Sequence, residues 1–168
     1  VCDFYAKNAQ TFLQDEHIET EFHKSILSYE PMGVILGVMP WNFPFWQVIR
    51  FAVPTLMAGN TVLLKPAPNV FQSTKALENL FWEAGFPKDV FQVIYVDHDL
   101  TALAIKEKAI KAISFTGSTK GGRAVESQAA KYGKKSVLEL GGSDPFIILE
   151  DANLQKAAKA VVISRFKN

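Results

Sequence analysis

Three short segments of the sequence contain side chains that could do chemistry, and each follows a run of apolar residues. In the first, residues 40–44, two prolines fix a turn in which Asn42 lies between aromatic residues. An amide donor held in dry surroundings at a strand end can stabilise a developing oxyanion. The alternative is an Asn that bonds the backbone of its own turn, and the residue alone does not separate the two roles.

The second candidate is Glu139, which ends an apolar run and stands just before Gly141 and Gly142. A half-buried carboxylate in this position should have a raised pKa and could serve as a general base. A Glu that pairs with a Lys or faces solvent is the alternative. The sequence therefore offers Glu139 as a base without excluding a structural role.

The third segment, residues 115–122, reads Phe-Thr-Gly-Ser-Thr-Lys-Gly-Gly and opens a helical pattern. Its glycines allow close backbone approach, and first-turn N–H groups with the hydroxyls of Ser118 and Thr119 could bind an anion. An ordinary glycine-rich turn is the alternative. A Walker A loop is excluded because Arg123 and Ala124 stand where that motif requires Lys and Ser or Thr, and the G-x-G-x-x-G fingerprint is also absent.

The elements that must position these segments are apolar strands that alternate with amphipathic helices. The clearest helix has apolar residues at positions 77, 80, 81 and 84 and ends before Gly85 and Pro87. Strands are expected at 34–39, 61–64, 90–96, 112–115, 136–140 and 146–149, and further helices at 45–57, 101–108, 121–131 and from 153 onward. Pro54 predicts that the helix at 45–57 is kinked or short.

Continuous apolar strands separated by helices indicate a parallel sheet that is covered on both faces. The predicted fold class is therefore α/β, with a doubly wound Rossmann-like sheet whose ligands gather at the carboxyl ends of the strands. Residues 1–30 differ in character. Positions 1, 5, 9 and 12 fall near helical spacing and residues 18–29 are typical of exposed strands, so a boundary is expected near Pro31, with the nucleotide-binding domain over residues 31–168.

Composition narrows the possible partners. A chain of 168 residues with 48% apolar side chains can form one compact domain, and its net charge of +1 leaves no broad field for nucleic acid or a membrane surface. Cys2 is the only cysteine, which excludes an internal disulfide and fits a reducing cytoplasm. No apolar run is long enough to span a membrane. No metal is predicted, because His17, His23 and His98 lack ligand spacing.

Four segments in this order resemble the aldehyde dehydrogenase superfamily: Pro-Trp-Asn-Phe-Pro at 40–44, Leu-Lys-Pro-Ala at 64–67, residues 115–122, and Glu-Leu-Gly-Gly at 139–142. The resemblance covers nearly all of residues 31–168, and residues 1–30 are similar to the end of the family's N-terminal region. It implies that the sequence is about a third of an enzyme. Residues 166–168 resemble the start of the Asn-x-Gly-Gln-x-Cys segment that carries the nucleophile, and Cys2 has no expected catalytic role.

The resemblance implies a role for each matching residue. In the family, a cysteine attacks the aldehyde, hydride passes to nicotinamide, and water hydrolyses the thioester. Asn42 matches the oxyanion-stabilising side chain and Glu139 the base that activates water, while Lys65 matches the ribose-binding lysine and Gly117 with Ser118 the pyrophosphate loop. The cofactor-binding residues implied are Met39, Pro40, Trp41, Lys65, Ala67, Pro68, Gly117, Ser118, Thr119 and Leu140.

Two departures from the family pattern leave the cofactor as NAD or NADP. Pro68 stands where many NAD-dependent members carry a Glu that would repel a 2′-phosphate, so NADP is admissible. The acidic turn Asp97-His98-Asp99 follows the third strand of the predicted sheet, where members often have glycines. Its carboxylates would oppose NADP if they lie near the phosphate path.

Arg50 indicates the substrate. It lies on an apolar helical face, where an unpaired guanidinium is costly to bury, so it must pair with a protein carboxylate or bind an acidic substrate. An Arg eight residues after the matching Asn resembles the carboxylate-binding arginine of succinate-semialdehyde dehydrogenases, and residues 46–50, 67–70 and 142–145 resemble a bacterial branch of that group. Succinate semialdehyde is therefore the expected substrate. The resemblance also implies a homo-oligomer, either a dimer or a tetramer. The alternatives are a dehydrogenase of other specificity and a non-catalytic nucleotide-binding protein.

Overall fold

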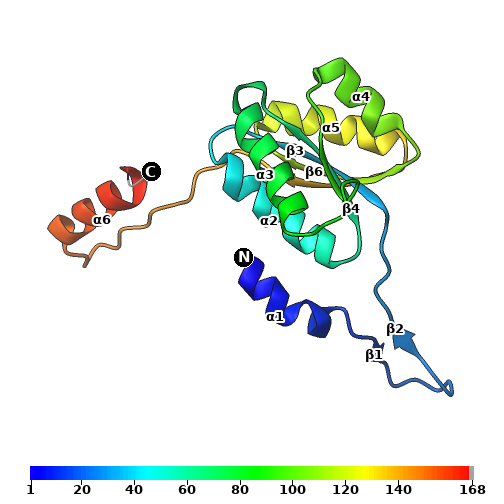
Figure 1. The fold of residues 1–168 in the computed structure, drawn as a ribbon. Coiled ribbons are helices and arrows are strands. Elements are labelled where there is room, and N and C mark those ends of the chain that lie inside the picture. The colour runs from blue at the N-terminus through cyan, green and yellow to red at the C-terminus, as the bar shows by residue number, and fades with distance from the viewer. Residues whose placement is uncertain (167–168) are drawn as a thin grey trace.

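The computed structural model describes residues 1–166, and its centre is a five-stranded parallel sheet with the order β5-β4-β3-β6-β7. The strands are β3 (Val34–Met39), β4 (Thr61–Pro66), β5 (Phe91–Val93), β6 (Ile110–Thr116) and β7 (Lys135–Glu139). The connections are α2 (Pro44–Met57), η1 (Pro68–Val70), α3 (Phe71–Glu83), α4 (His98–Lys106) and α5 (Thr119–Lys131). Helices α2 and α3 lie on one face and α4 and α5 on the other (Figure 1). The predicted parallel sheet with two covered faces is confirmed.

The alternation of side chains along β3 explains why both faces are covered. Leu36 and Val38 pack among residues of α4, α5 and β6, whereas Met39 packs among residues of α2, α3 and β4. Successive residues of a strand point to opposite faces, so a strand that is apolar at every position needs a helix layer on each side. The two apolar cores hold the sheet between them.

The order of the strands reverses between β3 and β6. The chain runs from β3 to β4 and β5 on one side, then returns to β6 and β7 on the other side of β3. In doubly wound sheets, a crevice opens at the carboxyl ends of the two strands where the order reverses. Residues 40–44, which follow β3, and the loop 117–118, which follows β6, are therefore brought to the same edge.

Local capping groups explain several differences from the predicted boundaries. Helix α4 begins earlier than predicted because the Asp97 side chain accepts a hydrogen bond from the Leu100 N–H. Helix α5 likewise begins earlier because Ser118 Oγ accepts from the Gly121 N–H. Of the two effects predicted for Pro54, a kinked or a short helix, the shortening is wrong, since α2 continues for 14 residues to Met57.

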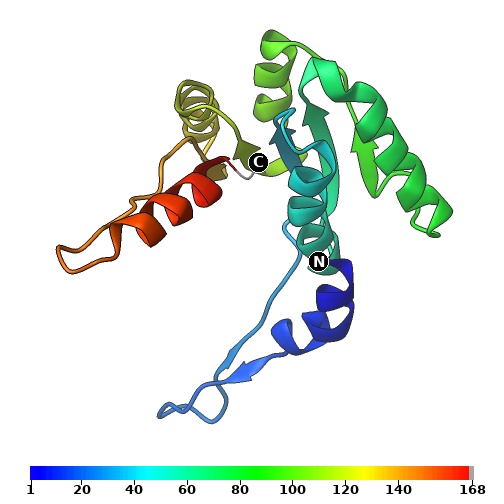
Figure 2. The same ribbon diagram turned by 90° about the vertical axis from the view of Figure 1, so that its left-hand side faces the viewer.

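The strand predicted at residues 146–149 is wrong. These residues form no strand and are exposed, and the Ile147 side chain is 78% accessible. A strand requires a neighbour to complete its backbone hydrogen bonds, and none of residues 1–166 pairs with this segment. Helix α6 (Leu154–Phe166), which was predicted, follows this segment and stands away from the sheet (Figures 1 and 2).

The N-terminal residues form α1 (Cys2–Phe12) and a small antiparallel pair, β1 (Glu16–His17) with β2 (Ile26–Leu27). The helix was predicted, whereas the expected strands within 18–29 reduce to the two residues of β2. Helix α1 packs beside α2, and the β1–β2 pair extends beyond the body of the sheet (Figure 2). Within residues 1–166 no helix is both long and apolar enough to cross a membrane. The domain boundary near Pro31 stays a prediction.

Gly37 sets how closely α2 can approach β3, and we predict that Gly37→Ala destabilises the fold. An added Cβ would lie 2.4 Å from Phe51 Cε1 of α2. Overpacking of this kind costs about 1–3 kcal/mol, which urea unfolding can measure. The control is Gly142→Ala, because a Cβ there meets no atom within 4 Å. Equal stabilities of the two variants would show that α2 does not depend on this contact.

Candidate active site

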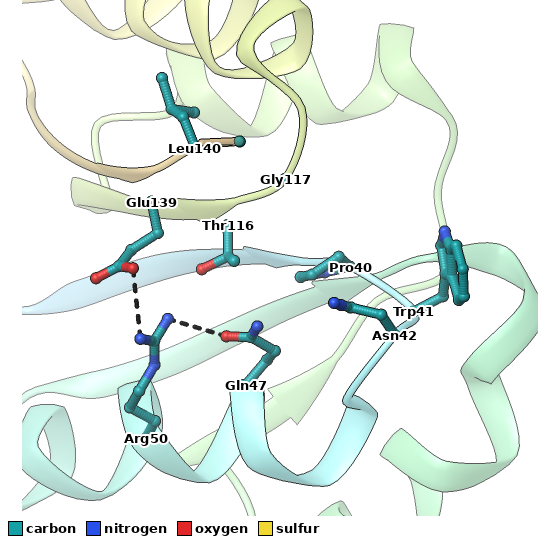
Figure 3. Close-up of a pocket in the computed structure, with 10 residues that line it drawn as sticks. Pro40, Trp41, Asn42, Gln47, Arg50, Thr116, Gly117, Glu139 and Leu140 are labelled. Atoms are coloured by element: carbon teal, nitrogen blue, oxygen red, sulfur yellow. Dashed lines mark hydrogen bonds and ion pairs between the residues drawn. The ribbon is translucent and has the colours of Figure 1, made fainter. Parts of the chain in front are cut away.

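A cavity of about 450 Å³ opens where β3 and β6 diverge (Figure 3). It is lined by Pro40, Trp41, Asn42, Gln47, Arg50, Thr116, Gly117, Glu139, Leu140 and Gly141. Asn42 comes from the turn after β3, Arg50 from the second turn of α2, and Glu139 from the end of β7. The three side chains predicted to act on the substrate therefore line one cavity, although they lie far apart in the sequence.

Arg50 projects from α2 across this cavity toward Glu139 (Figure 3). Its Nη1 lies 3.4 Å from Glu139 Oε2, and its Nη2 donates a hydrogen bond to Gln47 Oε1 at 2.9 Å. The side chains of Arg50 and Glu139 are 37% and 56% exposed, so the pair is solvated and contributes about 1 kcal/mol or less. Of the two alternatives stated for Arg50, pairing with a protein carboxylate is observed.

Two predicted environments are wrong. Glu139 is exposed rather than half-buried because β7 is the outermost strand of the sheet within residues 1–166. Asn42 is exposed rather than held in dry surroundings, since its turn extends past the end of β3 and its neighbours Trp41 and Phe43 are themselves 63% and 47% accessible. The side chains of Glu139 and Asn42 could be buried only by groups other than residues 1–166.

A second cavity, of about 600 Å³, lies on the opposite face of the sheet between α4 and α5. Val38, Lys65 and Phe115 line it from the strands. Lys65 is only 6% exposed as a residue, but its ammonium opens onto the cavity and has no hydrogen-bond or ion-pair partner within residues 1–166. Burial lowers the pKa of Lys65, and the attraction of Asp97 partly offsets that effect. A largely buried lysine whose ammonium opens onto a cavity favours an anionic or hydroxyl-rich ligand.

The loop between β6 and α5 connects the two cavities. Gly117 lines the first cavity and Ser118 the second, and the Gly117 N–H donates to the Glu139 carbonyl oxygen at 3.0 Å. A Cβ at Gly117 or Gly121 would come within 3.0 Å of the Phe115 ring, so the glycines let the loop close over that ring. Packing against Phe115 therefore requires glycine at these two positions of the segment 115–122, whether or not the loop binds a ligand.

The remaining predicted cofactor residues are scattered. Met39 is buried in the core beneath α2 and α3 and reaches neither cavity. Pro68 lines a third, apolar cavity of about 410 Å³ beside Tyr95 and Asp97. Ala67 lines none of these three cavities, and Thr119 is exposed in the first turn of α5. Pro40, Trp41, Gly117 and Leu140 line the cavity that contains Asn42.

Two residues near the site were not predicted. Gln47 could have been found because it precedes Arg50 by three residues, a spacing that places two side chains on the same helix face. Lys120 lines the Lys65 cavity from the first turn of α5, together with His98 and Asp99. Its place follows from where α5 begins, which the sequence pattern put two residues too late. Among residues 1–166 no group of His, Cys, Asp and Glu side chains is arranged to hold a metal ion.

Comparison with known proteins assigns the chain to a family. The sequence profile of the Aldehyde dehydrogenase family matches residues 1–168. The chain belongs to this family. The predicted resemblance is thereby confirmed, and so is the fold, which matches solved members of the family at a TM-score above 0.9.

Individual relatives are similar over the whole chain but are much longer. A probable NADP(+) succinate-semialdehyde dehydrogenase from Synechocystis sp. is 50% identical over 100% of the chain, which covers 37% of that relative. Succinate semialdehyde dehydrogenase Sad of Escherichia coli is 45% identical, again over 100% of the chain and 36% of the relative. The succinic semialdehyde dehydrogenase of Streptococcus pyogenes, solved with NADP+, has a TM-score of 0.91 at 36% identity over 97% of this chain and 36% of its own. The chain thus spans little more than a third of these relatives.

The lowered pKa of Lys65 has a consequence for stability. A lysine that binds its proton more weakly in the folded state opposes folding while it is protonated, and this cost disappears as pH rises past its ordinary value of 10.5. We predict that Lys65→Met stabilises the protein by on the order of 1 kcal/mol at neutral pH, and that the difference shrinks in alkali. Urea unfolding at several pH values measures it. Lys120→Met, at an exposed position, is the control, and a destabilised Lys65→Met protein would contradict the prediction.

Proposed function

We propose that this chain forms the nucleotide-binding region of an NAD- or NADP-dependent aldehyde dehydrogenase that oxidises succinate semialdehyde to succinate. The observation that carries the proposal is the convergence of Asn42, Arg50 and Glu139 on one cavity at the point where the strand order reverses. Relatives at 45% and 50% identity that carry succinate-semialdehyde dehydrogenase names support the substrate.

Asn42 and Glu139 would act at successive steps. In the mechanism that the family implies, a cysteine thiolate adds to the aldehyde carbon, and the carbonyl oxygen gains negative charge. The Asn42 amide would donate a hydrogen bond to that oxygen. After hydride has left the carbon, Glu139 would accept a proton from the water that attacks the thioester, and the thiolate would leave as the acid forms.

The residues of the second cavity fit a dinucleotide. Lys65 offers an ammonium that opens onto the cavity and has no hydrogen-bond or ion-pair partner within residues 1–166, and the first turn of α5 offers N–H groups that have no intrahelical acceptor. We propose that Lys65 holds the adenosine ribose and that the loop at Gly117 and Ser118 holds the pyrophosphate. When bound, the nicotinamide would accept the hydride.

The charges in this cavity are compatible with both NAD and NADP. Lys65 and Lys120 would attract a 2′-phosphate, whereas Asp99 would repel it. Asp97 is already engaged, because its carboxylate caps α4. Pro68 lines the neighbouring cavity beside Tyr95 and Asp97, so it brings no charge to this one. We therefore propose that both cofactors are used and that their ratio depends on Asp99.

A homo-oligomer and a cytoplasmic location are part of the same proposal. Ile26 and Leu27 of β2 are 41% and 46% accessible, and exposed apolar surface of this kind is often covered by a partner subunit. Cys2 is a free and exposed thiol, which fits a reducing compartment.

We predict that Asn42→Ala in the full-length enzyme lowers turnover by about a hundredfold, because one donor to the developing oxyanion is lost. Binding of the dinucleotide should change little. Steady-state rates and cofactor titration measure the two effects. Asn79→Ala, at an exposed position of α3, is the matched control. A rate equal to that of the control would remove Asn42 from the mechanism.

We predict that Arg50→Ala raises the KM for succinate semialdehyde by about ten- to a hundredfold, the range expected for hydrogen bonds to a charged group. The KM for butanal, which has a similar length and no charge, should change far less. Arg123→Ala on the exposed side of α5 controls for general loss of positive charge. Equal shifts for the two aldehydes would make Arg50 a structural residue.

A further inference from the structure

Arg50 contacts the side chain that is proposed to activate water. The same guanidinium is proposed to bind the substrate carboxylate, so one group serves two anions in a single cavity. We propose that the carboxylate of the substrate displaces Glu139 from Arg50, and that Glu139 is free to act as a base only after this exchange. This inference rests on the proposed function and adds a link between substrate recognition and hydrolysis.

The two contacts of Arg50 differ in strength. Nη2 donates to Gln47 Oε1 at 2.9 Å, which is ordinary hydrogen-bond geometry, whereas Nη1 lies 3.4 Å from Glu139 Oε2. Both ends of the longer contact are solvated, with 37% and 56% of the side chains exposed. The contact with Glu139 is therefore the one that another anion can replace at small cost.

The edge of the guanidinium formed by Nη1 and Nη2 already carries two acceptors. A carboxylate binds an arginine best through two parallel N–H donors. Gln47 lies three residues before Arg50 on α2 and accepts from Nη2, while Glu139 accepts from Nη1. A carboxylate that binds this edge through two donors therefore competes with Glu139 for Nη1. Figure 3 shows Arg50 Nη1 and the Glu139 carboxylate facing each other across the cavity.

Release changes what Glu139 can do. A carboxylate that accepts from a guanidinium has one oxygen engaged, which leaves it fewer acceptor positions for the attacking water. After exchange, the substrate carboxylate carries the contact with Arg50, and both oxygens of Glu139 face the cavity. An uncharged aldehyde leaves the pair intact, so its acyl intermediate should hydrolyse more slowly.

The competition can be measured without turnover. Succinate is titrated calorimetrically into the full-length wild-type enzyme, Arg50→Gln, Glu139→Gln and the double variant. We expect Glu139→Gln to bind succinate about two- to fivefold more tightly than the wild type, the factor that corresponds to loss of an exposed ion pair. Arg50→Gln should bind it more weakly. In the Arg50→Gln background, the change at Glu139 should have no further effect.

Three results of the titration would overturn the proposal. The first is an unchanged or weaker affinity in Glu139→Gln, and the second is the same gain in both backgrounds, which would reflect the general field of the carboxylate. The third is an absence of succinate binding in all four proteins. None of these depends on oxidation of succinate semialdehyde. A failure of the proposed function would appear separately, as missing turnover in the wild type.

Release of the base is tested in a second measurement. Single-turnover hydrolysis of the acyl enzyme formed from propanal is followed with and without added acetate, at constant ionic strength. We expect acetate to accelerate hydrolysis about two- to fivefold in the wild type and not in Arg50→Gln. Arg123→Gln, which changes an exposed arginine on α5, should respond like the wild type. An equal rate with and without acetate in the wild type would overturn the release step.

Discussion

Pairing of β3 with β6 is the constraint on which the rest of the molecule depends. These two parallel strands are paired in register from Ile35 to Val38, with a shift of one residue at Val34, and the chain leaves them toward opposite faces of the sheet. The turn that carries Asn42 and the loop that carries Gly117 therefore have to separate at the same edge. Both cavities follow from that separation, one toward α2 and one between α4 and α5. Neither helix layer alone would create a site.

Much of this fold can be predicted from the sequence because the patterns that specify its helices and strands are local. The apolar run 34–39 and the helix that stops at Gly85 were predicted closely, since alternation and capping act over a few residues. The predictions that failed depend on contacts between residues far apart in the sequence. Residues 146–149 are apolar enough for a strand but lack a partner, and the exposure of Glu139 depends on which strand is outermost. The contact between Arg50 and Glu139 spans 89 positions, which no local pattern encodes.

Lys65 illustrates how a site can oppose the stability of the fold that carries it. Its side chain is largely buried beside α4 and α5, its ammonium has no partner among residues 1–166, and burial lowers its pKa. Perturbed groups of this kind are frequent at functional sites. Arg50 differs, because a protein carboxylate and an amide already contact it. The two cationic groups are thus balanced in different ways.

The sheet itself separates the two cavities. Thr116 faces the cavity with Asn42, whereas its neighbour Phe115 faces the cavity with Lys65, because adjacent residues of β6 point to opposite sides. Mutations around α4 and α5 can therefore reshape the cavity with Lys65 while the cavity with Asn42 keeps its lining, and mutations on α2 can do the reverse. Such a partition allows the two cavities to diverge in separate evolutionary steps.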